Sequence, residues 1–188
     1  MATGTIPFVL EVICNVNIFT GSKTLDAASY TTGFAYDSAD RPTTVTYPTG
    51  ETVTQTYTAR GLPNTLSGSA VGSLVTGMLY NQMGQVTQIN PGNGTQTAFG
   101  YWDVGGANDN AGGYYGRLWR IQTAGPGGDL QDVRHTWDAG ANLIQREDVQ
   151  GGEIENFGYD FLDRLVSASG PYTEGYTYNQ IGNMMSKN

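Results

Sequence analysis

An aromatic residue recurs about every twenty positions along this sequence, and a turn-forming segment follows it each time. The anchors are Tyr36, Tyr57, Tyr80, Tyr101, Trp137, Tyr159 and Tyr178, at steps of 21, 23, 21, 36, 22 and 19 residues. Such a regular repeat is architectural, because one unit is too small to bury its apolar face and must pack on its neighbours. The chain is therefore expected to fold as stacked copies of one small element.

The residues around each anchor favour β-strands over helices. Glycine and proline, 27 and 7 in number, fall inside every span long enough to be a helix. Two positions before the anchors, mostly large side chains give one strand face a period of two: Phe34, Gln55, Met78, Phe99, His135, Phe157 and Tyr176. Four positions after the anchors stand residues suited to tight turns: Asp40, Gly61, Gly84, Ala141, Asp163 and Gly182.

A second set of turns lies midway between the anchors, in TYPTGE, INPGNG, AGPGGD, QGGE and SGPY. Each unit is therefore a hairpin, and the hairpins predict about fourteen strands of about 5 to 8 residues that pair with their sequence neighbours. We predict an all-β fold, an elongated or spiralling antiparallel meander sheet built from about seven hairpin repeats. Residues 1–30 match no unit and are predicted to form an N-terminal strand or edge segment, ahead of a repeat sheet over residues 31–188.

The repeat resembles that of the Rhs-repeat or YD-repeat family, whose unit reads approximately Y-D-x-x-G-R-L. YDSADRP at Tyr36 and YDFLDRL at Tyr159 match it well, and GYYGRLWRI supplies the G-R-L portion after an insertion. The resemblance covers residues 31–187, although Arg is absent after the turn in four units and no D-P-x-G motif occurs. It implies part of a β-shell, which in bacterial polymorphic toxins and insecticidal toxin complexes encloses a toxin, and in teneurins serves adhesion.

This resemblance implies a non-catalytic structural scaffold that encloses or presents a toxin or effector. The alternative is an extracellular module that forms filaments or binds glycans in adhesion. Tyr172, Tyr176 and Tyr178 are the candidate glycan contacts, because flat rings can stack on sugar faces. The favoured interpretation of the aromatic residues is structural, as cross-strand ladders that stabilise a sheet with few leucines and isoleucines.

No catalytic residue and no cofactor site is predicted. The chain has one histidine and one cysteine, too few for a soft-metal cluster, and no nucleophile–histidine–carboxylate set can be assembled from the sequence. His135 fills a slot that other units give to an aromatic ring, so we interpret it as a packing residue. Cys14 has no internal disulfide partner and is interpreted as a buried structural thiol. The aspartates that follow the anchors are interpreted as turn caps, which bond backbone N–H groups two residues on.

An insertion at residues 104–115 interrupts the repeat after Tyr101. It lacks the D-x-D-x-D-G spacing and the terminal glutamate of an EF-hand, so the favoured interpretation is a solvent-exposed loop. The alternative is a calcium site, because this region carries oxygen ligands of the kind that Ca²⁺ prefers: Asp103, Asn108, Asp109 and Asn110.

Charge and composition restrict the partners and the compartment. The net charge of −8 disfavours nucleic acid, because phosphates would be repelled. The apolar run at residues 6–13 is too short for membrane insertion and lacks the basic flank of a signal peptide, so it is interpreted as a strand. An extracellular or cell-surface location is expected, although the sequence shows no secretion route. At the open sheet edges we expect further repeats of a longer chain, or other copies that pair residues 172–187 with residues 8–17.

Overall fold

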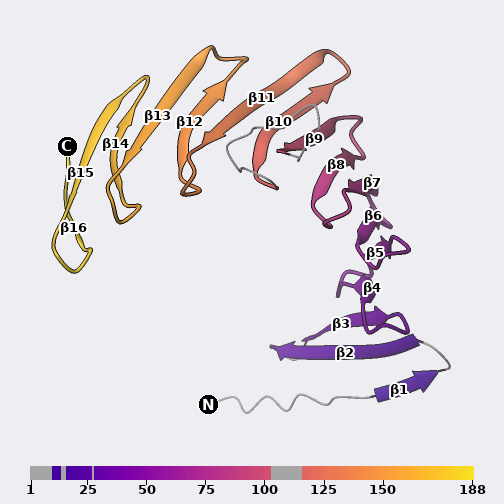
Figure 1. Cartoon of the computed structure of the whole chain (residues 1–188). Helices are drawn as coiled ribbons and strands as arrows, with labels where there is room; N and C mark the ends of the chain where they lie inside the picture. The colour runs from indigo at the N-terminus through magenta and orange to yellow at the C-terminus, as the bar shows by residue number, and fades with distance from the viewer. Residues whose placement is uncertain (1–9, 14–15, 27, 103–115) are drawn as a thin grey trace. The chain divides into compact units, whose positions relative to one another are not determined.

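The computed structural model describes residues 10–13, 16–26, 28–102 and 116–188, and the regular elements among them are all β-strands. No helix with the length and apolar character of a membrane span occurs in these residues. The chain divides into two compact units, Met1–Gly94 and Thr95–Asn188. Figure 1 shows the strands of each unit side by side in chain order.

In the first unit, every strand pairs antiparallel with the strand that follows it. The strands are β1 (Leu10–Ile13), β2 (Val16–Leu25), β3 (Ala28–Tyr36), β4 (Pro42–Thr46), β5 (Thr52–Tyr57), β6 (Pro63–Gly68), β7 (Gly72–Tyr80) and β8 (Val86–Pro91). β1 and β2 lie largely in the segment that matches no repeat unit, and they raise the number of strands above the expected fourteen. The apolar run thus contributes an edge strand at residues 10–13.

The second unit has the same antiparallel pairing of sequence neighbours. Its strands are β9 (Gln96–Tyr101), β10 (Leu118–Gly125), β11 (Gly128–Trp137), β12 (Leu143–Asp148), β13 (Glu153–Tyr159), β14 (Leu165–Ser169), β15 (Thr173–Tyr178) and β16 (Met184–Lys187). The predicted all-β antiparallel meander is confirmed. It arises because the fully described connections within a unit are short turns, which join antiparallel neighbours.

The turn after each anchor has one recurring geometry. The Asp37 N–H donates to the Arg41 carbonyl at 3.0 Å, and the Asp40 N–H donates to the Asp37 carbonyl at 3.1 Å. The same two bonds recur after the other anchors. The last but one residue of each loop has positive φ, and these residues are Asp40, Gly61, Gly84, Gly116, Ala141, Asp163 and Gly182. A type I turn followed by one left-handed residue suits antiparallel strands, so the predicted turn positions are confirmed.

A bulge follows the turn in every repeat. Tyr36 pairs with Pro42 whereas Ala35 pairs with Thr44, so Thr43 is an extra residue on β4. The other anchor strands show a register shift at or next to the anchor. A bulge bends its strand and increases the local twist. Each repeat therefore has the same bend at the start of the strand that follows its turn.

The two faces of the sheet carry different side chains in the first unit. The anchor face, defined as the face that carries the anchor rings, holds apolar residues directly opposite one another: Phe19, Phe34, Val45 and Val53. The opposite face, called the hydroxyl face, carries Thr44, Thr54 and Ser67 in register. Directly paired residues on one face are the unit of sheet stabilisation, so the strand alternation predicted from the sequence is present.

Most side chains are half-buried. Among the described residues, Gly68, Asp132 and Ala168 are the buried ones, and no large side chain is fully buried. The anchor rings are therefore only partly removed from water. Hydrogen bonds that fix the rings and turns therefore add to this partial packing in holding the repeats together.

Candidate functional site

The residue after each anchor caps the turn. Asp37 Oδ1 accepts hydrogen bonds from the N–H groups of Ala39, at 2.9 Å, and Arg41, at 3.1 Å. Asp160 Oδ1 accepts the equivalent bonds from Leu162 and Arg164, at 2.9 and 3.1 Å. The predicted role of these aspartates as turn caps is thus present in the structure. Asn81, Asp138, Asn179 and, with a hydroxyl, Thr58 cap the other described turns in the same position.

The arginine of the motif pairs with this capping aspartate. Arg41 Nε lies 2.8 Å from Asp37 Oδ2, and Arg164 Nε lies 2.7 Å from Asp160 Oδ2. The hydrogen bond from the arginine, followed by the backbone N–H bonds, holds the pKa of Asp37 and of Asp160 below the ordinary value. The Y-D-x-x-G-R sequence is therefore one self-contained turn, closed on both oxygens of its carboxylate.

Five of the seven anchors also bind the preceding repeat, and we call this contact the staple. The Tyr57 hydroxyl donates to the Pro42 carbonyl at 2.7 Å, and the Tyr80 hydroxyl donates to the Pro63 carbonyl at 2.6 Å. The acceptor is each time the residue that pairs with the previous anchor after its turn. The second unit repeats the staple from Trp137 to Leu118, from Tyr159 to Leu143 and from Tyr178 to Leu165, at 2.7, 3.0 and 2.8 Å.

Trp137 shows why an aromatic donor matters at this position. Its indole N–H makes the staple that a tyrosine hydroxyl makes in the other repeats. Burial raises the pKa of the Tyr80 and Tyr159 hydroxyls, and for Tyr159 the charge of Asp138 adds to that effect. These hydroxyls therefore remain protonated donors at neutral pH. The departure from tyrosine that the sequence shows at Trp137 keeps the function of the anchor.

A second contact, which we call the clamp, joins the same repeats through a side chain at the turn. The Arg41 guanidinium lies over the Tyr57 ring at 4.4 Å from its centroid, and Arg164 lies over Tyr178 at 4.7 Å. A Cβ on Gly61 would come within 2.9 Å of the Arg41 guanidinium, so a larger residue there would displace this side chain. The arginine of the motif thus serves its own turn and the next repeat.

Repeats that depart from the motif obtain the clamp in other ways. Arg60, inside its turn, donates to the carbonyls of Asn81 and Gln82 at 2.8 and 3.0 Å. Asn142, at the arginine position, donates to Asp163 at 2.8 Å. A staple and a clamp together define what we call a junction, and all five junctions that lie inside a unit have both contacts.

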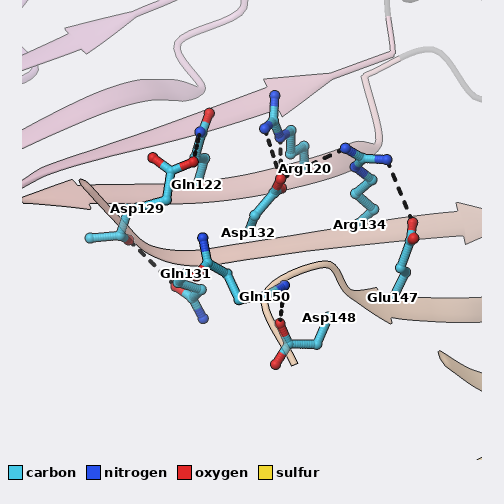
Figure 2. Close-up of polar contacts among 10 residues, drawn as sticks. Arg120, Gln122, Asp129, Gln131, Asp132, Arg134, Glu147, Asp148 and Gln150 are labelled. Atoms are coloured by element: carbon cyan, nitrogen blue, oxygen red, sulfur yellow. Dashed lines mark hydrogen bonds and ion pairs between the residues drawn. The ribbon is translucent and has the colours of Figure 1, made fainter. Parts of the chain in front are cut away.

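The hydroxyl face of the second unit holds a charged cluster (Figure 2). Asp132 on β11 is 4% exposed and accepts two bonds from Arg120 on β10, at 2.7 and 2.8 Å. Arg134 lies 3.7 Å from Asp132 on one side and 3.7 Å from Glu147 on the other. The bonds from Arg120 lower the pKa of Asp132 and raise that of Arg120. Sequence reasoning did not single out this cluster, because its members share no motif.

His135 lies on the anchor face of the second unit and stacks on Trp137, with centroids 6.4 Å apart and an interplanar angle of 24°. Burial, and then the nearby charge of Arg146, lowers its pKa. It lines a hollow of about 320 Å³ with Val133, Arg146 and Glu155 among its neighbours. Stacking and a neutral ring fit the predicted packing role of an aromatic substitute.

Asp103, Asn108, Asp109 and Asn110, the candidate calcium ligands, lie outside the described residues, as does Cys14. Within the described ranges, no group of three or more His, Cys, Asp or Glu side chains is placed to hold a metal ion.

The three candidate glycan tyrosines make contacts within the chain. The Tyr172 hydroxyl donates to Glu155 at 2.8 Å, and the Tyr176 hydroxyl donates to Glu174. Tyr178 makes a staple and carries Arg164 over its ring. Their hydroxyls are therefore engaged in the sheet, and nothing in the arrangement supports a sugar site.

Comparison with known proteins agrees with the repeat geometry. Residues 22–52 match the family model described as RHS Repeat. Among curated proteins, none matches the chain significantly. The family match begins within the first thirty residues and includes the end of β2 and all of β3 and β4.

Several solved structures share the fold. The crystal structure of TcdB2-TccC3-Cdc42 is similar with a TM-score of 0.74 at 19% identity, over 90% of this chain and 10% of that chain. The crystal structure of TcdB2-TccC3 gives 0.72 at 19% identity, over 90% and 11%. The Photorhabdus luminescens Tc holotoxin pore gives 0.71 at 20% identity, over 90% and 10%.

These findings confirm the resemblance to the Rhs or YD-repeat family that the motif indicated. The chain shares its all-β fold over 90% of its length with these Tc toxin structures. It spans about a tenth of the length of each of those chains.

Proposed function

We propose that this chain is a non-catalytic wall segment of an Rhs-type β-shell that encloses or presents a toxin or effector polypeptide. The observation that carries the proposal is the junction. The anchor and the arginine of the motif contact the neighbouring repeat, and the capping aspartate holds the arginine in its turn. A sheet whose motif residues maintain register between repeats is built to be extended, which is what a wall requires.

The junction geometry also indicates which partners such a segment would have. Its partners are further repeats, which continue the sheet, and the polypeptide that the sheet encloses or presents. The likeness to Tc toxin structures supports an extracellular or cell-surface setting for it. Because the chain covers about a tenth of those structures, one such segment would supply a small part of a complete shell.

Electron cryomicroscopy of the protein as its own cell makes it is the test. We expect this sheet as one ordered part of a larger curved β-wall, with one face turned towards enclosed or presented density. A sheet with both faces in bulk solvent, in a particle no larger than the chain itself, would refute the shell. Binding of the purified chain on a glycan panel, abolished by Tyr172→Ala, would instead favour the adhesion alternative.

A further inference from the structure

A hollow of about 320 Å³ lies on the anchor face of the second unit, over strands β10 to β13. One row of directly paired residues runs through its lining, in the order Ile121, Val133, Asp148 and Glu153. β9 and β14 flank these four strands, so the hollow lies inside the sheet and not at one of its edges. Its volume is at the lower end of the range of small-molecule sites.

The acidic end of this row lacks a cation. Asp148 on β12 and Glu153 on β13 are directly opposite each other, and like charges in that arrangement destabilise a sheet. Among the described residues, no Lys, Arg or His side chain forms an ion pair with either carboxylate. A positive group placed between them would remove this repulsion.

The other charged residues of the hollow do not supply that group. Arg146 pairs with Glu155 at 2.5 Å, and Glu155 also accepts a hydrogen bond from the Tyr172 hydroxyl at 2.8 Å. His135 carries no charge at neutral pH, because burial and then the charge of Arg146 lower its pKa. Arg146 and Glu155 cancel, so the hollow retains the two negative charges of Asp148 and Glu153.

A buried ring nitrogen is the second observation at this hollow. Nδ1 of His135, one of the lining residues, has no hydrogen-bond partner among the described residues. Buried polar atoms are nearly always hydrogen-bonded, so each exception calls for an explanation such as a bound molecule. The hollow therefore combines two opposed carboxylates and an unmatched imidazole nitrogen with the apolar side chains of Ile121 and Val133.

We propose that the hollow is a binding site for a primary alkylammonium group, whose aliphatic stem packs on Ile121 and Val133 while its ammonium lies between Asp148 and Glu153. Such a ligand matches both parts of the row, because its stem is apolar and its head is a compact cation. The site uses neither staples nor clamps, so it is an activity beyond that of the scaffold.

The geometry of Asp148 favours an ammonium over a guanidinium. Its Oδ1 already accepts the N–H groups of Gln150 and Gly151, at 3.0 and 3.1 Å, the first of which is drawn in Figure 2. A planar guanidinium pairs best with both oxygens of one carboxylate, whereas an ammonium donates singly to several acceptors. A metal ion is disfavoured as well, since the described residues contain no group of three His, Cys, Asp or Glu side chains placed to hold one.

An NMR titration of the full chain with pentylammonium at neutral pH tests the site. We expect saturable shifts of the backbone amides around Val133, Asp148 and Glu153, with a Kd on the order of 1 mM, and no saturable shifts in the first unit. The neutral control is 1-pentanol, which has the same stem without the charge and should bind at least about tenfold more weakly.

Two variants that remove the same charge locate the ammonium. Glu153→Gln should weaken pentylammonium about tenfold, because it removes one of the two opposed carboxylates. Glu147→Gln is the matched control, since Glu147 lies next to Asp148 in sequence but belongs to the hydroxyl face, and it should change the affinity by less than about twofold. Equal weakening by both variants would show a general attraction to an acidic chain and would overturn the site.

A third ligand, Nα-acetyl-lysine methylamide, identifies where the ammonium comes from. An affinity equal to that of pentylammonium would indicate a lysine side chain of a polypeptide, and one about tenfold lower would indicate a small free amine. Either result supports the site. Absence of saturable binding by pentylammonium, or its displacement by an equal concentration of Ca²⁺, would refute it.

Discussion

The two units build the same repeat around different side chains. In the first unit, one row of directly paired residues on the anchor face is apolar throughout: Phe19, Phe34, Val45 and Val53. In the second unit, a comparable row starts apolar and ends charged: Phe99, Ile121, Val133, Asp148 and Glu153. The turn, the bulge and the staple are nevertheless the same in both.

The charge distribution follows the same division. The first unit has 3 Lys or Arg and 5 Asp or Glu, a net charge of −2, and the second has 6 and 12, a net charge of −6. Among the described residues, the first unit contains one ion pair, Arg41–Asp37, and the second contains the other six. The repeat accommodates few or many charged side chains because the staples are directed at backbone carbonyls, which every residue possesses.

If the frame is common to both units, removing an anchor should cost the same in each. Tyr80→Ala in the first unit and Tyr159→Ala in the second each remove a ring and a staple. We expect each to lower the free energy of unfolding by about 2–4 kcal/mol, below the value for a fully buried ring because these rings are half-buried. Urea unfolding with hydrogen exchange read separately in each unit measures this. Losses below ~1 kcal/mol at both positions would show that the anchors do not hold the frame.

The charged cluster should make the second unit fragile in a way that the first is not. Arg120→Met leaves Asp132 buried without its bidentate partner. We expect a loss of about 1–3 kcal/mol in the second unit, because Arg120 is itself 28% exposed and water can partly replace it.

The double variant Arg120→Met with Asp132→Leu is the control for this cluster, since it removes both charges together. We expect it to recover most of the lost stability in the same urea titration. A single variant as stable as the original chain would show that Asp132 is adequately solvated or held by Arg134 alone.

The sequence predicted what depends on neighbouring residues. The positive φ of Asp40, Ala141 and Asp163 could be placed because the turn lies at a fixed distance from its anchor. The aspartate caps followed from local side-chain chemistry, and the strand order followed from short connections. Between the repeats one turn escaped, at residues 69–71 before Gly72, because it has neither the proline nor the adjacent glycines of the other such turns.

The junctions could not be predicted, because their partners lie on different repeats. A periodic tyrosine indicates packing, but nothing in the motif shows that its hydroxyl reaches the carbonyl of Pro42 or Pro63. Arg60 stands at a variable position of the unit and still clamps the next turn. The burial of Asp132 depends on the pairing of β10 with β11, which follows an insertion that the motif does not describe.

A subtler change isolates the staple from the ring. Tyr80→Phe and Tyr159→Phe each remove one hydroxyl and leave the aromatic surface in place. We expect losses of about 0.5–1.5 kcal/mol, similar in the two units, from the free energy of unfolding in urea. A clear loss of stability in one unit alone would contradict a common frame. It would show that the staple matters only when the anchor face is apolar, as in the first unit, or only when it is partly charged, as in the second.

Of the changes considered, acidification should show the smallest difference between the units, because most of the carboxylates concerned remain partly accessible to water and salt, which weaken their interactions. In the first unit, bonds from Arg41 and from backbone N–H groups lower the pKa of Asp37. In the second unit, hydrogen bonds lower the pKa of five carboxyls: Asp132, Asp138, Glu155, Asp160 and Glu174.

A carboxyl with a lowered pKa in the folded state contributes stability above its unfolded pKa of about 4, and that stability is lost as pH falls through the folded value. Acidification from about pH 6 to about pH 3 should therefore raise hydrogen-exchange rates more in the second unit than in the first, once the intrinsic pH dependence of exchange is removed. Asp160→Asn keeps the turn cap but removes the charge, so it should reduce the acid sensitivity of its own repeat. Equal loss of protection in both units would show that these carboxylates contribute little and that the shared backbone frame alone sets stability at low pH.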